Sequence, residues 1–381
     1  MAQTYKSFLV LFFKNEHAFL LPLAGAVWLA LEQGWRQGTA WALGAALGFV
    51  MFQASFSFAG AFRRLLAERR GAGVRAQLLM IAVASLLILP ATVSGEVLGQ
   101  AVRGLVFAPG LAVGVGALLF GVGMQLGGGC ASGCLFGAGG GSTRLWLTLV
   151  FFVLGATLTS WQSEWWTGWW APAPVALGTV LGPGLALAAT LAVLAAAFAG
   201  LWWLERARHG VAAPMPRAMV WAALALAGLN FATLLVVGRP WAITAAFPLW
   251  GAKAVEALGL DEPAFWPWWE DPTRIEALLR PLWADRTTAM DLGMLAGAFV
   301  AAVLAGRLAR TWRLKAGEVA ASVLGGLLLG VGAMLGSGCN ISAYVSGIAS
   351  GSVHGWLWIG PALLGNWVGL RLRPGFGIRD T

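Results

Sequence analysis

The chain has 381 residues, of which 59% are hydrophobic and only 11% are charged, and its formal net charge is +9. A soluble domain needs about 25% charged residues to meet water, so this composition excludes a globular protein surrounded by solvent. The positive charge does not indicate nucleic-acid binding, because the arginines gather in short loops between apolar segments.

The sequence predicts an all-α integral membrane protein with about ten transmembrane helices, since a helix of about 17 to 25 apolar residues crosses a bilayer. Apolar runs of this length fall at about 17–33, 39–62, 76–95, 105–126, 143–161, 180–204, 217–238, 287–307, 318–337 and 355–372. An eleventh run, about 242–259, contains Pro248 and Lys253 and is interpreted as a re-entrant or interfacial segment.

The basic loops predict the orientation, because cytoplasmic loops of membrane proteins are rich in Lys and Arg. The arginine-rich loops at 63–75, 205–217 and 307–317 are placed inside, which also places both termini inside, in agreement with Lys6, Lys14 and Arg379. The tryptophan-rich stretch 162–178 and the acidic segment 260–286 then lie outside. We expect the external segment 260–286 to form a folded cap near the membrane interface.

An internal repeat ends in a cysteine in each copy. The sequence GVGMQLGGGC at Gly121–Cys130 recurs 209 residues later as GVGAMLGSGC at Gly330–Cys339, with seven of ten positions identical. Five spans separate the corresponding elements, and an odd number inverts the topology. We therefore expect a single transport domain, 1–381, built of two inverted repeats at about 39–204 and 217–372, with a substrate site near the midplane.

The glycines before each cysteine predict a broken or re-entrant helix, because consecutive glycines are costly inside a helix. A short helix that starts after Cys130 would present its positive N-terminus to an anion, and Gly338 and Cys339 would build the matching site. The structural alternative is that Gly129 and Gly338 only allow close helix packing and that the cysteines are small buried residues.

Other polar residues in the apolar runs carry weaker hypotheses. Cys134, four residues after Cys130, is either a second pathway thiol or a packing residue. Asp291 is an ionisable group in an apolar run, but its place near the end of the run favours a solvated side chain. Asn230 and Asn366 are interpreted as helix–helix hydrogen-bonding groups.

At Gly128-Gly129-Cys130-Ala131-Ser132-Gly133 and at Gly338-Cys339-Asn340 the sequence resembles the YeeE/YedE-like sulfur-transport family, over about residues 39 to 372. The resemblance implies uptake of thiosulfate, or a similar small sulfur-containing anion, across the cell inner membrane along a path of cysteine thiols. The family's first such cysteine falls at Ser57 here, within Ser55–Arg63. The implied path comprises Cys130, Cys339, Cys134, Ser57, Gly129 and Gly338, with no metal and no cofactor.

The same resemblance implies partners and leaves alternatives open. It implies a TusA-like sulfur-carrier protein on the cytoplasmic side, besides the lipid bilayer and the transported anion, and no nucleic acid. The alternatives are transport of another sulfur or selenium species, or a membrane sulfurtransferase or thiol oxidoreductase that uses Cys130 and Cys134. The enzyme is disfavoured, because the spacing is not the C-x-x-C of thioredoxin-type chemistry and no general base is evident nearby.

Overall fold

The apolar runs fold as helices because a helix satisfies its own backbone N–H and C=O groups where no water is present. The computed structural model describes residues 20–309 and 313–378, so Lys6, Lys14, Arg310 and Arg379 lie outside the described residues. The long helices are α2 (Trp35–Ala54), α4 (Ala72–Ser94), α5 (Leu111–Gly127), α7 (Thr143–Trp161), α10 (Pro183–His209), α11 (Arg217–Val237), α14 (Arg286–Leu304), α15 (Ala316–Leu335) and α16 (Val353–Leu372).

Shorter elements fill the connections between the long helices. The short helices are α3 (Phe58–Glu68), α6 (Ala131–Gly139), α8 (Ser163–Thr167), α9 (Leu177–Leu181), α12 (Phe247–Ala257), α13 (Pro272–Leu279) and the π-helix η4 (Asn340–Gly347). The 3-10 turns are η1 (Pro263–Phe265), η2 (Pro267–Glu270), η3 (Leu282–Ala284) and η5 (Arg373–Phe376), and β1 (Glu96–Val97) pairs antiparallel with β2 (Gln100–Ala101).

The helices make the chain an all-α, multi-pass membrane protein. Within the described residues, eight segments are long and apolar enough to cross a membrane. The other two expected spans correspond to the apolar helix Leu20–Gln33, described only from Leu20 onward, and to α16, which is 20 residues long.

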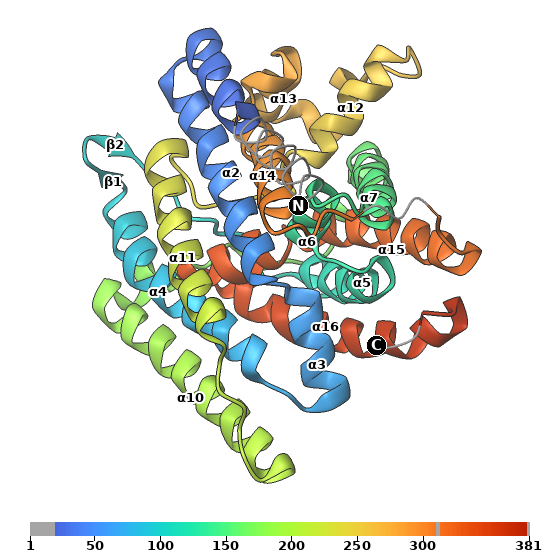
Figure 1. Ribbon diagram of the computed structural model, residues 1–381. Coiled ribbons are helices and arrows are strands. Elements are labelled where there is room, and N and C mark those ends of the chain that lie inside the picture. The colour runs from blue at the N-terminus through green and yellow to red at the C-terminus, as the bar shows by residue number, and fades with distance from the viewer. Residues whose placement is uncertain (1–19, 310–312, 379–381) are drawn as a thin grey trace, which may run out of the picture.

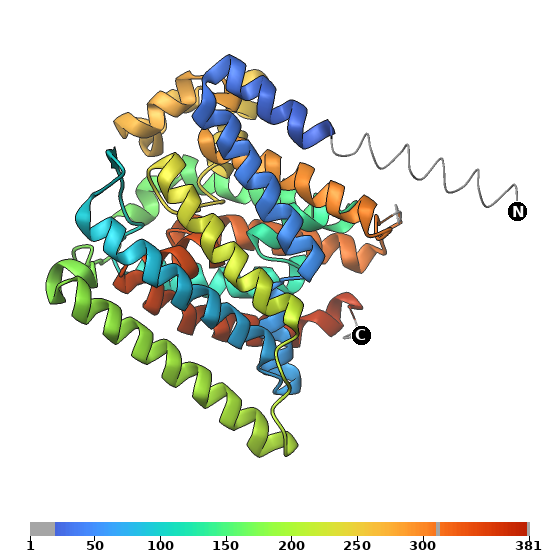
Figure 2. The same ribbon diagram turned by 60° about the vertical axis from the view of Figure 1, so that its left-hand side comes forward.

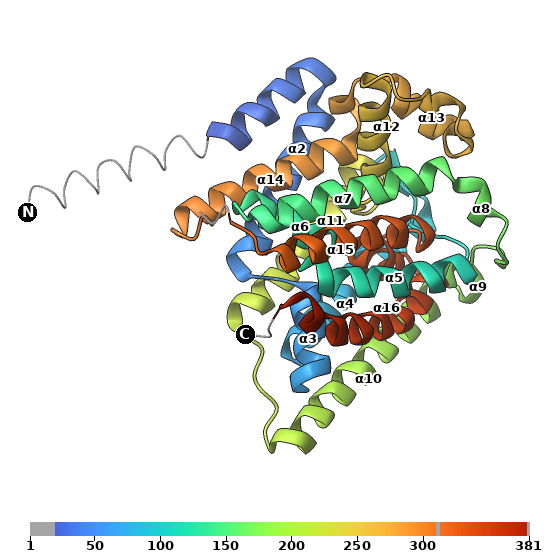
Figure 3. The same cartoon turned by 90° about the vertical axis from the view of Figure 1, so that its right-hand side faces the viewer.

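Four helices that carry or follow the Gly–Cys motifs pack together through glycine. Figure 3 shows α7, α15, α5 and α16 side by side, and α14 packs on α2 and α6. A Cβ added to Gly325 would collide with the backbone of Gly127, and one added to Gly116 would collide with that of Gly336. Helices α5 and α15 therefore run antiparallel at backbone contact, as small residues allow in membranes.

The loops gather at two opposite ends of the helices. One end, here called the arginine end, contains the loops 63–75 and 205–217 and the described residues 307–309 and 313–317; there Ala309 N donates to Gly140 O at 2.9 Å. The other, the tryptophan end, contains 162–178 and 260–286; there Leu111 N donates to Trp170 O at 2.9 Å. The two ends lie at the left and right of Figure 3.

The segment 260–286 is folded, as expected of a cap. Its η1, η2, α13 and η3 pack on α12, and Leu249, Ala252, Trp266, Trp269 and Leu278 form a small apolar core of their own. Helix α12 has only 11 residues and carries Pro248 in its first turn, so it is too short to cross a bilayer. Figure 1 shows α12 and α13 together at the edge of the molecule.

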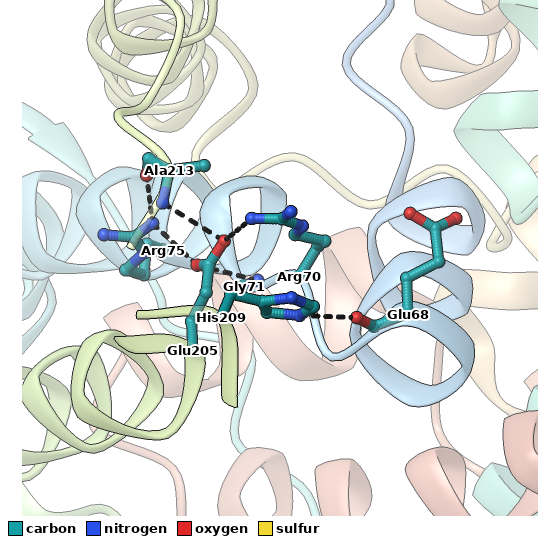
Figure 4. A network of polar contacts seen from close by, with 7 residues as sticks. All are labelled: Glu68, Arg70, Gly71, Arg75, Glu205, His209 and Ala213. Atoms are coloured by element: carbon teal, nitrogen blue, oxygen red, sulfur yellow. Dashed lines mark hydrogen bonds and ion pairs between the residues drawn. The ribbon is translucent and has the colours of Figure 1, made fainter. Parts of the chain in front are cut away.

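Helix α10 lies along the outside of the bundle against α4 (Figure 2) and is fixed at the arginine end by one buried carboxylate. Glu205 is 1% exposed and accepts hydrogen bonds from Gly71 N at 3.1 Å, Ala213 N at 3.2 Å and Arg75 Nη2 at 3.0 Å. Arg75 is itself buried, whereas Arg70, which pairs with the same carboxylate at 3.5 Å, is 43% exposed. Figure 4 shows these groups converging on Glu205.

We expect Glu205→Ala to destabilise the folded protein by about 3 to 5 kcal/mol, because it leaves the Arg75 guanidinium buried without its counter-charge. Thermal unfolding of the purified protein in detergent measures this. The control Arg70→Ala removes an exposed partner of the same carboxylate and should cost at most about 1 kcal/mol. Equal losses in the two variants would show that the buried pair does not hold α10.

Candidate functional site

The first Gly–Cys motif interrupts a membrane helix as the glycines predict. Helix α5 ends at Gly127, and Gly128 adopts the left-handed conformation with φ of +86°, which glycine tolerates at a helix C-terminus. Cys130 is the N-cap of α6, in extended conformation, and its side chain makes no capping hydrogen bond. Its Sγ lies 3.2 Å from Ser132 Oγ, so the thiol sits over the first turn of the short helix.

The second motif likewise interrupts a membrane helix, and its backbone lies closer to a neighbouring side chain. Helix α15 ends at Leu335, and Gly338 has a φ of +139°. A Cβ added there would collide with Ser342 Oγ, so a larger residue does not fit. Cys339 is the N-cap of η4, again extended. Ser342 Oγ accepts the Cys339 N–H at 2.9 Å and donates to Cys339 Sγ at 3.5 Å.

The two cysteines therefore occupy the same local position in the two halves of the chain. Each is buried in one common apolar cluster. Because each cysteine is the N-cap residue of a short helix, backbone N–H groups and the positive end of a helix dipole lie beside it. This arrangement suits an anion with a soft sulfur end.

Cys134 and Ser57 lie at different kinds of position. Cys134 is one turn into α6, is fully buried, and its N–H donates to Cys130 O at 2.8 Å. Ser57 is the N-cap of α3, and its Oγ accepts the Gly60 N–H at 3.1 Å. Ser57 thus shares the N-cap position of Cys130 and Cys339, whereas Cys134 does not. Gly129 is closely covered, since a Cβ there would lie 3.1 Å from Gly133 C.

Two arginines donate hydrogen bonds to the last carbonyl groups of α5 at the first break, a role that the sequence did not suggest. Arg144 Nη2 donates to Leu126 O at 2.6 Å and Arg373 Nη1 donates to Gln125 O at 3.1 Å. Thr148 Oγ1 donates to Gly127 O at 3.0 Å. The last carbonyls of α5 are thereby paired, while the N-terminus of α6 receives no side-chain cap. The interruption is left with an excess of donors.

Polar groups without partners surround the second break, and sequence reasoning missed them as well. Within the described residues, Asn340 Nδ2 and Oδ1 and Trp358 Nε1 are buried without a hydrogen-bond partner. Asn340 directly follows Cys339, and a Cβ on Gly336 would lie 3.0 Å from Trp358 Nε1. Buried groups of this kind are rare and indicate a ligand or ordered water. Asn366 and Asn230, by contrast, are hydrogen-bonded between helices as expected.

Comparison with known proteins gives a consistent family. A relative from Spirochaeta thermophila named thiosulfate transporter TsuA is 28% identical over 270 residues, which cover 66% of this chain and 74% of the relative. The Escherichia coli protein of the same name is 26% identical over 338 residues, which cover 85% of this chain and 91% of the relative. An Escherichia coli protein named probable transporter YedE is 29% identical over 143 residues, which cover 36% of this chain and 33% of the relative. The family model described as sulphur transport matches residues 53–368, and the chain belongs to that family.

Proposed function

We propose that this protein imports thiosulfate, or a similar small sulfur-containing anion, through a pathway lined by Cys130 and Cys339. The observation that carries the proposal is that each cysteine begins a short helix where a membrane helix is interrupted. The names of two relatives, each a thiosulfate transporter, support the choice of anion.

The chemistry of thiosulfate matches these turns. It is a dianion with three oxygens and a soft terminal sulfur. Backbone N–H groups at the starts of α6 and η4 suit the oxygens, and a thiol S–H is a weak donor suited to the sulfur. Asn340, whose side chain is unpartnered, adds an amide donor beside Cys339. A neutral thiol serves this purpose, since a thiolate would repel the anion.

Transport requires that each site be weak enough to release the ion to the next. Cys339 and Cys130 supply two such sites from the two halves of the chain. Ser57 offers a hydroxyl at a third N-cap, where the family's early cysteine would stand. Cys134, buried inside α6, either adds a thiol beside Cys130 or only packs. We infer a pathway and not an enzyme, because passage needs no covalent turnover.

We propose further that the halves at about 39–204 and 217–372 are inverted repeats. The helix pairing supports this: α5 packs on both α15 and α16, and α15 packs on both α5 and α7. Helix α16 follows η4 as α7 follows α6. An exchange of the halves maps the pair α5–α16 onto α15–α7, and the antiparallel pair α5–α15 onto itself.

We place the protein in the cell inner membrane with the arginine end in the cytoplasm, because short basic loops stay inside. Anions then approach at the tryptophan end and leave beside Arg144 and Arg373. A TusA-like sulfur carrier is the proposed partner at the arginine end.

Replacing either pathway thiol should reduce transport without unfolding the protein. We expect Cys130→Ala and Cys339→Ala each to lower the initial rate of radiolabelled thiosulfate uptake into proteoliposomes about tenfold or more, since each loses a donor to a charged ligand. The control Cys134→Ala removes a thiol of equal size from the same helix and should have the smaller effect.

Normal uptake by both Cys130→Ala and Cys339→Ala would mean that the repeated cysteines only pack. Labelled sulfur left covalently on the wild-type protein, detected as a mass increase, would instead favour the sulfurtransferase.

The orientation is tested by introducing single cysteines at exposed positions and labelling whole cells with a membrane-impermeant thiol reagent. The three native cysteines are buried, so they should give little background labelling. We expect Glu164→Cys, at the tryptophan end, to react in intact cells. Arg208→Cys, at the arginine end, should react only after the membrane is opened. The reverse pattern would place the arginine end outside the cell and would contradict the proposed orientation.

A further inference from the structure

Asp291 is a carboxylate buried in the membrane-spanning part of α14. Its side chain is 0% exposed, and neither oxygen has a hydrogen-bond partner among the described residues. This differs from the solvated position that the sequence favoured, because α2 and α6 pack along α14. A charged carboxylate is costly in such a place, and binding a proton removes that cost.

A cavity of about 380 Å³ lies at the tryptophan end where α14 begins. Its charged lining residues are Arg36, Arg103, Arg239, Arg280 and Arg286, with Glu276 and Asp285. Five guanidinium groups against two carboxylates leave the cavity positive. Burial lowers the pKa of Arg239, and Asp285 opposes that effect; an arginine stays charged nonetheless. A dianion is therefore drawn to this cavity.

Asp291 connects the cavity to the cysteine pathway. Arg239 Nη2 donates to Thr287 Oγ1 at 2.8 Å, and Thr287 lies one helical turn before Asp291 on the same face of α14. Helix α14 packs on α2 and on α6, the short helix that begins after Cys130. A Cβ added to Gly139, at the end of α6, would collide with Leu295 O, one turn after Asp291, so Asp291 lies toward the Cys130 end of that contact. The titratable residue of α6 is Cys134, and the charged residue of α2 is Arg36.

We propose that Asp291 takes up a proton together with each anion and so couples anion import to proton influx; this rests on the proposed function. An ionised Asp291 repels a dianion at the start of α6, whereas a protonated one does not. Proton and anion therefore favour each other's binding by the same factor. The proton comes from the external cavity, stays on the carboxylate while the anion passes the start of α6, and leaves to the cytoplasm.

Coupling to protons reduces the electrical work of importing a dianion. A dianion that enters the cell moves against an inside-negative potential, and each accompanying proton cancels one of its two charges. A proton fits the site better than a metal cation. Sodium needs several oxygen ligands, whereas neither oxygen of Asp291 has a polar partner among the described residues.

The test measures protons and anions together in proteoliposomes that contain a trapped pH indicator, with the membrane potential clamped by valinomycin and potassium. On addition of radiolabelled thiosulfate, the wild type should acidify the interior as the anion enters. Asp291→Asn keeps the neutral shape, so it should still exchange internal for external thiosulfate. Its ratio of protons to anions should be lower by about one. The control Glu270→Gln, at an exposed carboxylate of the segment 260–286 outside the cavity lining, should keep the wild-type ratio.

A second measurement uses the wild type alone. Its infrared difference spectrum on adding thiosulfate should gain a protonated carboxyl band, and the absence of that band would contradict proton uptake by a carboxyl group. Thiosulfate uptake without proton influx, uptake that follows a sodium gradient, or an unchanged ratio in Asp291→Asn would overturn the coupling alone. Absence of any thiosulfate uptake by the wild type would instead overturn the proposed function.

Discussion

The structure depends on one constraint: backbone N–H and C=O groups at membrane depth must find partners inside the protein or face a cavity. Helices α5 and α15 both stop within the bundle, and both are followed by short helices whose first N–H groups are newly exposed. Such interruptions persist only where surrounding groups or a ligand compensate for them. The positions of the two breaks therefore determine where an anion can be held.

At the first break, side chains pair the free carbonyl groups but do not cap the free N–H groups. Arg144, Arg373 and Thr148 pair the last carbonyls of α5. The start of α6 has no side-chain cap. At the second break Ser342 pairs the Cys339 N–H, yet Asn340 stays unpartnered beside it. Donors thus exceed acceptors at the first turn, and the second turn has the unpaired Asn340 Nδ2 as a donor, which suits an anion of several oxygens.

The sequence predicted the backbone of the site better than its side chains. The glycines before Cys130 and Cys339 were enough to locate both helix breaks, because the cost of glycine inside a helix is local. The burial of Asp291 was predicted wrongly, since it depends on α2 and α6, which pack on α14 and are distant from it in sequence. The lack of partners at Asn340 and Trp358 is likewise a tertiary property that no local pattern reports.

The central claim, that the anion is held between the starts of α6 and η4, is tested most directly by a structure determined with thiosulfate bound. Anomalous scattering from sulfur locates the ligand independently of its oxygens. The account predicts a thiosulfate sulfur in contact with Sγ of Cys339 or Cys130, with its oxygens toward the N–H groups of the adjoining short helix. Thiosulfate found elsewhere along the chain, with both Gly–Cys turns vacant under saturating anion, would contradict it.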